Sequence, residues 1–332
     1  MSEAPVLSVE NLSVAYEGAG AAHTIIDNVS FTLGRGEILG IVGESGSGKS
    51  MTCRALIRLL PSSLLRVTGG AVRLAGGQDV MALSPRDLTR VRGRRIGMIF
   101  QNPASHLDPV MTIGRQIAES IRHHHKVGRK EAWARMLDIL RQVGIPDPES
   151  RANAYTHEFS GGMRQRAMIA VALACDPEIL IADEPTTALD VTVQAQILRL
   201  LLQLRDERGL SIIFITHDLG VVYQLCDKVA VMYAGRICEY GPKDEVIHHP
   251  RHHYTAGLIA CQPSTTGDSG PVHTIAGQPP GAGDMPSGCR FHPRCQAADA
   301  VCAAHQPPLE EAEPGHARAC HHPLGTRTEA RA

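Results

Sequence analysis

The sequence predicts an α/β fold with a parallel sheet, because short runs almost free of polar side chains recur and each leads into glycine-rich or polar residues. These runs cover residues 37–42, 95–100, 179–182 and 211–216. Strands that are buried on both faces of a parallel sheet have this continuous apolar character. A chain of 332 residues with 43% hydrophobic content can bury a large core of this kind.

The first run leads into a complete glycine-rich phosphate loop, which consists of Gly43, Glu44, Ser45, Gly46, Ser47, Gly48, Lys49 and Ser50. In this pattern backbone N–H groups cradle phosphates, Lys49 reaches the β and γ phosphates, and Ser50 binds Mg²⁺. Residues 51–60, which open with Met51, are predicted to form a helix that ends before Pro61 and directs its positive dipole end at the phosphates. The sequence therefore predicts binding and hydrolysis of ATP with Mg²⁺.

Polar side chains follow the other three runs, at the sheet edge where ligands bind in open α/β folds. Asp183 and Glu184 follow the third run; we expect Asp183 to hold Mg²⁺ and Glu184 to polarise the attacking water. His217 follows the fourth run, where its ring N–H can reach the γ phosphate. Gln101 follows the second run, and its amide can coordinate the metal and hold the water; a plain surface glutamine is the alternative.

Five motifs occur in an order and spacing that resemble the ATP-binding cassette (ABC) family: Gln101, Ser160-Gly161-Gly162, Asp183-Glu184, Ala188-Leu189-Asp190 and His217. The resemblance implies a P-loop NTPase core with an antiparallel β edge and an inserted α-helical subdomain. It also implies that two cassettes enclose two nucleotides, each held by one subunit's phosphate loop and the other's Ser160-Gly161-Gly162 signature. Asp190 would lie at the dimer seam. Tyr16 would stack on adenine, with packing in an edge strand as its alternative.

The signature itself has a physical logic, since Ser160 can cap a helix that begins near Gly161 and so expose an anion-binding N-terminus. Phe159 before it and Met163 after it make a variant that resembles the ATPases of dipeptide, oligopeptide and nickel importers. Segments 250–255, 277–280 and 288–295 likewise resemble the tail of peptide-importer ATPases.

The resemblance implies an ATPase that powers import of di- and oligopeptides. Its expected partners are a second, related but non-identical ATPase, two transmembrane permease subunits and an extracytoplasmic solute-binding protein. By resemblance, the segment after Gln101 receives a short helix from the permease. Nickel or another small solute remains an alternative cargo, because such an ATPase never touches what is carried.

The sequence divides into an ABC ATPase domain over residues 1–250 and a cysteine-containing C-terminal extension over residues 251–332. The helical subdomain is expected over about 102–164, with a loop at 102–109 and helices at 113–123 and 130–143. Residues 261–286 are rich in Gly, Pro, Ser and Thr, which is typical of a flexible linker.

Charge and hydropathy narrow the function further. The formal net charge of −1 gives no sequence-independent attraction to nucleic acid, so no nucleic-acid partner is expected. No apolar stretch approaches the ~20 residues that span a bilayer, and the N-terminus has no basic region followed by an apolar one. We expect a peripheral protein at the cytoplasmic face of the inner or plasma membrane.

Four of the nine cysteines gather near the end of the chain: Cys289, Cys295, Cys302 and Cys320. A cytosolic tail disfavours disulfides, and metal–thiolate bonds would supply folding energy that its few apolar residues do not. Their spacing departs from the paired Cys-x-x-Cys of structural zinc, whereas four thiolates suit a [4Fe–4S] cluster, as in some peptide-importer ATPases. Zinc remains the alternative, including a mixed site with His292, His305 or His316. The other five cysteines are expected to be small buried hydrophobes.

Two other function classes compete with the importer. A soluble cassette ATPase acting on DNA or ribosomes typically has two cassettes in one chain or a long coiled-coil insertion, and the sequence shows neither. A redox-sensing module, in which the cysteine tail controls assembly, requires that loss of the cluster change complex formation.

Overall fold

The computed structural model describes residues 4–18, 22–262 and 274–325. The chain divides into two compact units. The first contains Met1–Val6, Leu33–Glu37 and Leu74–Ile215, and the second contains Leu7–Thr32, Ile38–Arg73 and Thr216–Ala332. Of the predicted linker over 261–286, residues 263–273 lie outside the described residues.

The first unit contributes three parallel strands, in the order β7 (Ser211–Ile215), β6 (Ile179–Asp183) and β5 (Ile96–Ile99). Every residue of these strands is buried, which explains why their sequences are almost free of polar side chains. Ile99 pairs with Ala182 and Asp183 with Ile215, so the carboxyl ends of the strands lie at one edge. The predicted runs match these strands to within one residue at each end.

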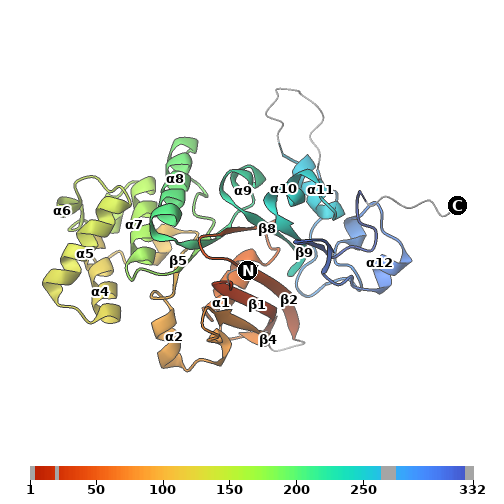
Figure 1. Ribbon diagram of the computed structural model, residues 1–332, viewed down its shortest axis with the longest axis horizontal. Helices are drawn as coiled ribbons and strands as arrows, with labels where there is room; N and C mark the ends of the chain where they lie inside the picture. The colour runs from red at the N-terminus through yellow and green to blue at the C-terminus, as the bar shows by residue number, and fades with distance from the viewer. Residues whose placement is uncertain (1–3, 19–21, 263–273, 326–332) are drawn as a thin grey trace. The chain divides into compact units, whose positions relative to one another are not determined.

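The helices of the first unit connect these strands and precede them. They are α2 (Pro85–Val91), α3 (Pro103–His106), α4 (Ile113–His125), α5 (Arg129–Gln142), α6 (Pro148–Arg151), α7 (Gly161–Leu173) and α8 (Val191–Arg208), with 3₁₀ turns η1 (Val80–Ala82) and η2 (Thr156–Glu158). Figure 1 shows α4, α5 and α6 grouped in yellow, with α4 and α5 both in contact with α7. Ile113, Ile117 and Ile121 form the fully buried stripe of α4, and each contributes about 2 kcal/mol by leaving water.

Two predicted helices of this unit are confirmed, since α4 extends the expected 113–123 to His125 and α5 matches 130–143 to within one residue. The loop expected at 102–109 is wrong in part, because Pro103–His106 form one helical turn. The Asn102 side chain caps this turn by accepting from Ala104 N at 3.0 Å. Pro103 occupies the first helical position, where its missing N–H costs nothing.

The second unit has two sets of strands. β3 (Ile38–Val42) pairs in parallel with β8 (Lys228–Tyr233), and antiparallel pairing continues from β8 through β9 (Arg236–Pro242) and β11 (His316–Arg318) to β10 (Glu310–Glu313). A separate sheet has the order β2 (His23–Leu33), β1 (Leu7–Tyr16), β4 (Leu65–Leu74), seen near the N-terminus in Figure 1. The antiparallel edge expected from the family is therefore present.

The helices of the second unit are α1 (Lys49–Leu56), α9 (Leu219–Leu225), α10 (Lys243–His248), α11 (His253–Ala260), α12 (Ala300–Ala304) and the 3₁₀ turn η3 (His292–Arg294). The prediction of a helix over 51–60 is wrong at both ends. The helix begins two residues earlier, at Lys49. It ends four residues earlier, because Arg58 takes a positive φ of 53° that the right-handed helix cannot continue through.

The C-terminal extension joins the sheet of the second unit. Ala317 and Arg318 of β11 pair with Tyr240 and Glu239 of β9. Glu239 is fully buried, and its carboxylate accepts from the backbone N of Arg251 at 2.7 Å and of His252 at 3.0 Å, with His316 Nε2 at 2.8 Å. A buried carboxylate with this many partners is stable inside the protein, so Glu239 fastens the extension at two points.

Four of the five cysteines expected to be buried are so: Cys53, Cys175, Cys226 and Cys238. The expectation is wrong for Cys261, which is partly exposed because it caps the C-terminal end of α11. Across residues 4–18, 22–262 and 274–325, none of the helices combines the length and the apolar content that a membrane span needs.

Candidate nucleotide and metal sites

The phosphate loop leaves the fully buried strand β3 and winds tightly against the end of β8. Gly43 has φ +150°, and a Cβ there would overlap the backbone O of Met232 and lie 2.8 Å from Ser47 Oγ. Gly48 has φ +101°, and its Cβ would lie 2.6 Å from Ile26 Cδ1. Glycine is therefore required at both positions, for the backbone conformation and for the space.

Lys49 opens α1, which places the helix N-terminus at the loop. Its side chain is buried, and the ammonium donates to the backbone O of Gly43 at 2.8 Å and of Glu44 at 2.9 Å. Ser47 is also buried, and its Oγ has no hydrogen-bond partner in the part of the chain that the structure describes. A buried ammonium, a free hydroxyl and a helix N-terminus together fit phosphate oxygens.

Glu184 and Gln101 meet at the carboxyl ends of β6 and β5. Gln101 Nε2 donates to Glu184 Oε2 at 2.9 Å, and Thr187 Oγ1 donates to the same oxygen at 3.0 Å. Glu184 has φ +46°, which is strained for a side chain of this size, and its N–H donates to Ile215 O at 3.1 Å. Asp183 is fully buried at the end of β6.

Sequence reasoning missed Thr187, although a hydroxyl three residues after a carboxylate in a turn is a signal that could have found it. Its hydrogen bond, together with that of Gln101, orients the Glu184 carboxylate.

The signature opens a helix, as expected. Ser160 caps α7 and accepts from Met163 N at 3.3 Å, while Gly161 and Gly162 form the first turn. Asp190 caps α8 by accepting from Val193 N at 2.9 Å. Two helix N-termini of the first unit therefore begin at residues that the family resemblance singles out.

The remaining two predicted site residues lie in the second unit. Tyr16 ends β1 and is partly exposed, with 37% of its surface accessible. His217 is exposed and precedes Asp218, which caps α9 by accepting from Gly220 N at 2.8 Å. The phosphate loop also belongs to the second unit, whereas Gln101, Asp183, Glu184, the signature and Asp190 belong to the first.

The four cysteines of the extension lie in one neighbourhood. Cys289 N donates to Cys302 O at 2.8 Å. The pKa of the Cys320 thiol is raised to about 11, mainly by burial and in smaller part by the charges of the other three cysteines. Burial likewise raises the pKa of Cys289, with added contributions from Cys302 and Cys295. The pKa of each of these two thiols is therefore affected by the charges of other cysteines in the group.

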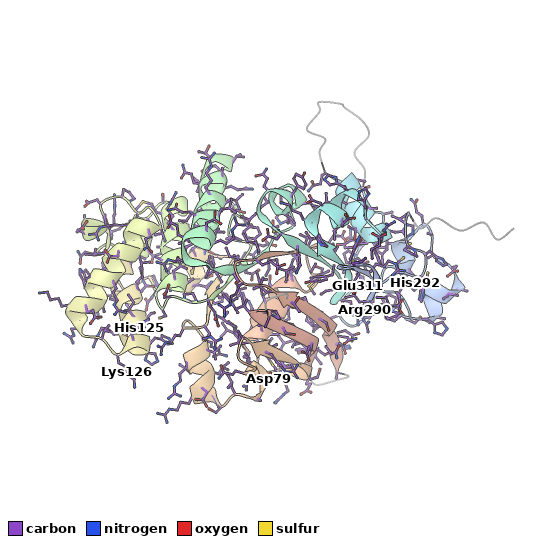
Figure 2. All side chains as sticks on the ribbon, in the orientation of Figure 1. Asp79, His125, Lys126, Arg290, His292 and Glu311 are labelled. Carbon is purple, nitrogen blue, oxygen red and sulfur yellow. The ribbon has the colours of Figure 1, made fainter. Side chains whose placement is uncertain are left out.

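Backbone N–H groups face three of the four sulfurs, and each favours the thiolate form. Those of Phe291 and His292 face Cys289, that of Ala297 faces Cys295, and that of His322 faces Cys320. Figure 2 labels His292 together with Arg290 in this segment of the extension. Such N–H groups are characteristic of the surroundings of metal-bound thiolates.

The spacing of the sulfurs exceeds that of a single tetrahedral zinc site. Among the described residues, no three of the four sulfurs lie within 4.8 Å of one another. Four sulfurs on one zinc ion, each about 2.3 Å from it, would lie roughly 4 Å apart. Two histidines of the expected mixed site each contact a protein group through one ring nitrogen: His292 Nδ1 lies 2.9 Å from Cys289 O, and His316 Nε2 bonds Glu239.

The glycine-rich loop, the helix that follows it and the carboxylates at the ends of parallel strands define a phosphate-loop ATPase. Comparison with known proteins identifies the family of this ATPase. Residues 26–187 match the ABC transporter family, and residues 238–302 match the C-terminal region of oligopeptide/dipeptide transporters.

Relatives cover nearly the whole chain. One in Sinorhizobium fredii, named a probable peptide ABC transporter ATP-binding protein, is 49% identical over 95% of this chain and 94% of its own. One in Brucella abortus, provisionally named a peptide import ATP-binding protein, is 49% identical over 92% of each chain. A dimeric bacterial ABC transporter cassette of known structure is 27% identical, with a TM-score of 0.64 over 71% of this chain and 98% of its own. A dimeric cassette in a post-hydrolysis state with ADP and phosphate gives the same values.

The chain belongs to the ABC transporter ATP-binding proteins, in the branch that carries the oligopeptide/dipeptide C-terminal region. It is an ATPase of that family.

Proposed function

We propose that this ATPase powers the import of peptides through a membrane permease. The observation that carries the proposal is the joining, in one chain, of a cassette phosphate loop to the C-terminal region of oligopeptide/dipeptide transporters over residues 238–302. Two relatives at 49% identity whose names refer to peptide transport support it.

In this proposal the phosphate loop, from Gly43 to Met51, binds the nucleotide. The N-terminus of α1 and the Lys49 ammonium receive the phosphates. Tyr16, which is partly exposed, is the proposed stacking partner of the adenine. The oxygen donors of Ser50, Gln101 and Asp183 suit Mg²⁺, which when bound neutralises charge on the phosphate oxygens.

Glu184 is the proposed general base. The Gln101 and Thr187 hydrogen bonds orient its carboxylate, which can then position the attacking water and take its proton. His217 is the proposed sensor of the γ phosphate, through a ring N–H. Phosphoryl transfer depends on positioning and charge stabilisation, which these side chains provide.

The capped N-termini of α7 and α8 are the proposed dimer contacts. In a dimer, Ser160, Gly161 and Gly162 would close over the partner's ATP, and Asp190 would lie at the seam. ATP shifts the equilibrium towards the closed dimer only if it contacts that state better, and the signature supplies the additional contacts. The proposed partner is a related, non-identical ATPase. Two permease subunits, an extracytoplasmic binding protein and a peripheral position on the cytoplasmic side of the membrane complete the assembly.

The test is uptake of labelled di- and oligopeptides, with nickel in parallel, by cells that carry Glu184→Gln in place of the original chain. We expect peptide uptake to fall to background while nickel uptake is unchanged. Loss of nickel uptake with intact peptide uptake would assign a different cargo. No defect in either would contradict the importer and favour a soluble or redox-regulated ATPase.

We further propose that Cys289, Cys295, Cys302 and Cys320 hold a [4Fe–4S] cluster, with zinc as the alternative. Two observations support the proposal: the cysteines lie in one part of the extension, and backbone N–H groups face three of their sulfurs. The bound group would tie three separate turns of the extension together.

The full chain, made anaerobically, is expected to contain iron and inorganic sulfide in equal amounts and to absorb broadly in the visible range. Cys295→Ser should lower the iron content and the melting temperature, whereas Cys261→Ser, outside the group, should change neither. Stoichiometric zinc in place of iron would support the alternative. Absence of both metals would contradict a metal site, and altered complex formation by Cys295→Ser would favour the redox-sensing class.

A further inference from the structure

Glu44 is the phosphate-loop residue that the C-terminal extension contacts. Its backbone N–H donates to the Tyr254 hydroxyl oxygen at 2.8 Å. Its carboxylate accepts from both terminal nitrogens of Arg294, at 2.7 and 3.0 Å. Its backbone O accepts from the Lys49 ammonium at 2.9 Å. All three polar groups of Glu44 are engaged, two of them by the extension and one by the lysine expected to reach the phosphates.

Arg294 is held in this position by hydrogen bonds from all three of its guanidinium nitrogens. Besides its fork on Glu44, Nε donates to Ala276 O at 2.9 Å, and the two terminal nitrogens also donate to Tyr233 Oη at 3.3 Å and Ile275 O at 3.2 Å. Its side chain is 5% exposed. The hydrogen bond to Glu44 is the main cause that raises the pKa of Arg294. A guanidinium with all five N–H groups satisfied has a single favoured orientation.

An aromatic cluster of Tyr233, Tyr254 and Phe291 supports both contacts. The ring of Tyr254 lies 4.7 Å from that of Tyr233 and 5.3 Å from that of Phe291, centroid to centroid. The Arg294 guanidinium lies 5.7 Å from the Tyr233 ring and 5.9 Å from the Phe291 ring. Tyr233 ends β8, next to Met232, whose backbone O limits the space at Gly43. The extension and the loop therefore both pack against the end of β8.

A second contact of the extension lies at the other side of the loop. Arg290 bonds Ala234 O and Asp27. The neighbouring Gly235 N donates to Ser47 O at 2.8 Å, and Asp27 N donates to Gly235 O at 2.9 Å. Both arginines lie between Cys289 and Cys295, so one short stretch of the extension contacts the loop directly through Arg294 and the neighbouring residues Asp27 and Ala234 through Arg290.

We propose that Arg294 and Tyr254 are positioning residues of the nucleotide site, acting through Glu44. They hold the phosphate loop in one conformation before ATP arrives, so less conformational freedom is lost on binding. Arg294 also neutralises a carboxylate that belongs to the loop that receives phosphates. Without Arg294, that carboxylate would repel the phosphates at short range.

The test compares ATP affinity, KM and kcat of full-length variants. Arg294→Ala should raise the Kd and KM for ATP about tenfold, because a loop carboxylate loses its buried partner, with kcat changed less than about twofold. Arg294→Lys, which keeps the charge and loses the fork, should have a smaller effect. Tyr254→Phe removes one hydroxyl and should raise KM about threefold.

Two further variants separate positioning from simple unfolding of the extension. Arg251→Ala removes an arginine that joins parts of the extension to one another, through Leu324 O and Glu313, without contacting the loop, and should leave KM for ATP unchanged. Glu44→Gln combined with Arg294→Ala should recover part of the affinity that Arg294→Ala loses, because it removes the repelling charge. An equal rise in KM for Arg251→Ala, no recovery in the double variant, or unchanged KM in Arg294→Ala would each overturn the proposal.

Discussion

Glu184→Gln is expected to lower ATP hydrolysis by about a hundredfold or more while ATP still binds, since general bases contribute this much. The amide keeps the size of the side chain, and its oxygen still accepts from Gln101 and Thr187. What it loses is the ability to take a proton from water. Steady-state hydrolysis and equilibrium ATP binding, measured on the same preparation, separate these two properties.

The matched control is Glu178→Gln, at the opposite end of the same strand. Glu178 pairs with Arg95 and lies directly before β6, so the chemical change is identical but remote from the carboxyl edge. It should cost at most about 1 kcal/mol of stability and leave hydrolysis intact. The role of Glu184 would be refuted by hydrolysis close to that of the unchanged protein, or by equal losses in the two variants.

The strands that carry the site residues were predictable because burial on both faces requires nearly every residue of a strand to be apolar. β3, β6 and β7 are almost unbroken apolar runs, and the residues after each run could be placed at the carboxyl end of that strand. The cap of α7 was predictable for a similar reason, since a serine before two glycines satisfies the first N–H groups locally.

Polar contacts between residues far apart in the chain produce no comparable sequence pattern. The Gln101–Glu184 hydrogen bond joins residues 83 positions apart, and Arg294 bonds Glu44 across 250 positions. Neither pair has a periodicity or a local composition that points to it. The end of α1 escaped prediction because Pro61 marked a stop, whereas the positive φ of Arg58 ends the helix before it.

Gly43→Ala is expected to abolish nucleotide binding and to destabilise the second unit by about 2–4 kcal/mol, since a strained backbone and an overpacked contact add. The added methyl group would overlap the Met232 backbone O, and it would lie 2.8 Å from Ser47 Oγ. Met232 lies in β8, where it cannot withdraw without breaking its pairing with Ile237. The loop must therefore move, and with it the carbonyl of Gly43 that receives the Lys49 ammonium.

Gly46→Ala in the same loop adds backbone strain without an overpacked contact, so the difference between the two variants measures the cost of packing against β8. Gly46 has φ +78°, but a Cβ there would meet nothing within 4 Å. Its cost in stability should therefore be only the backbone strain, about 1–2 kcal/mol. Thermal unfolding of both variants, with and without saturating ATP, measures the difference. If Gly46→Ala lowered the melting temperature as much as Gly43→Ala, contact with β8 would not be what requires glycine at position 43. A larger loss for Gly43→Ala would show that the end of β8 fixes the shape of the phosphate loop.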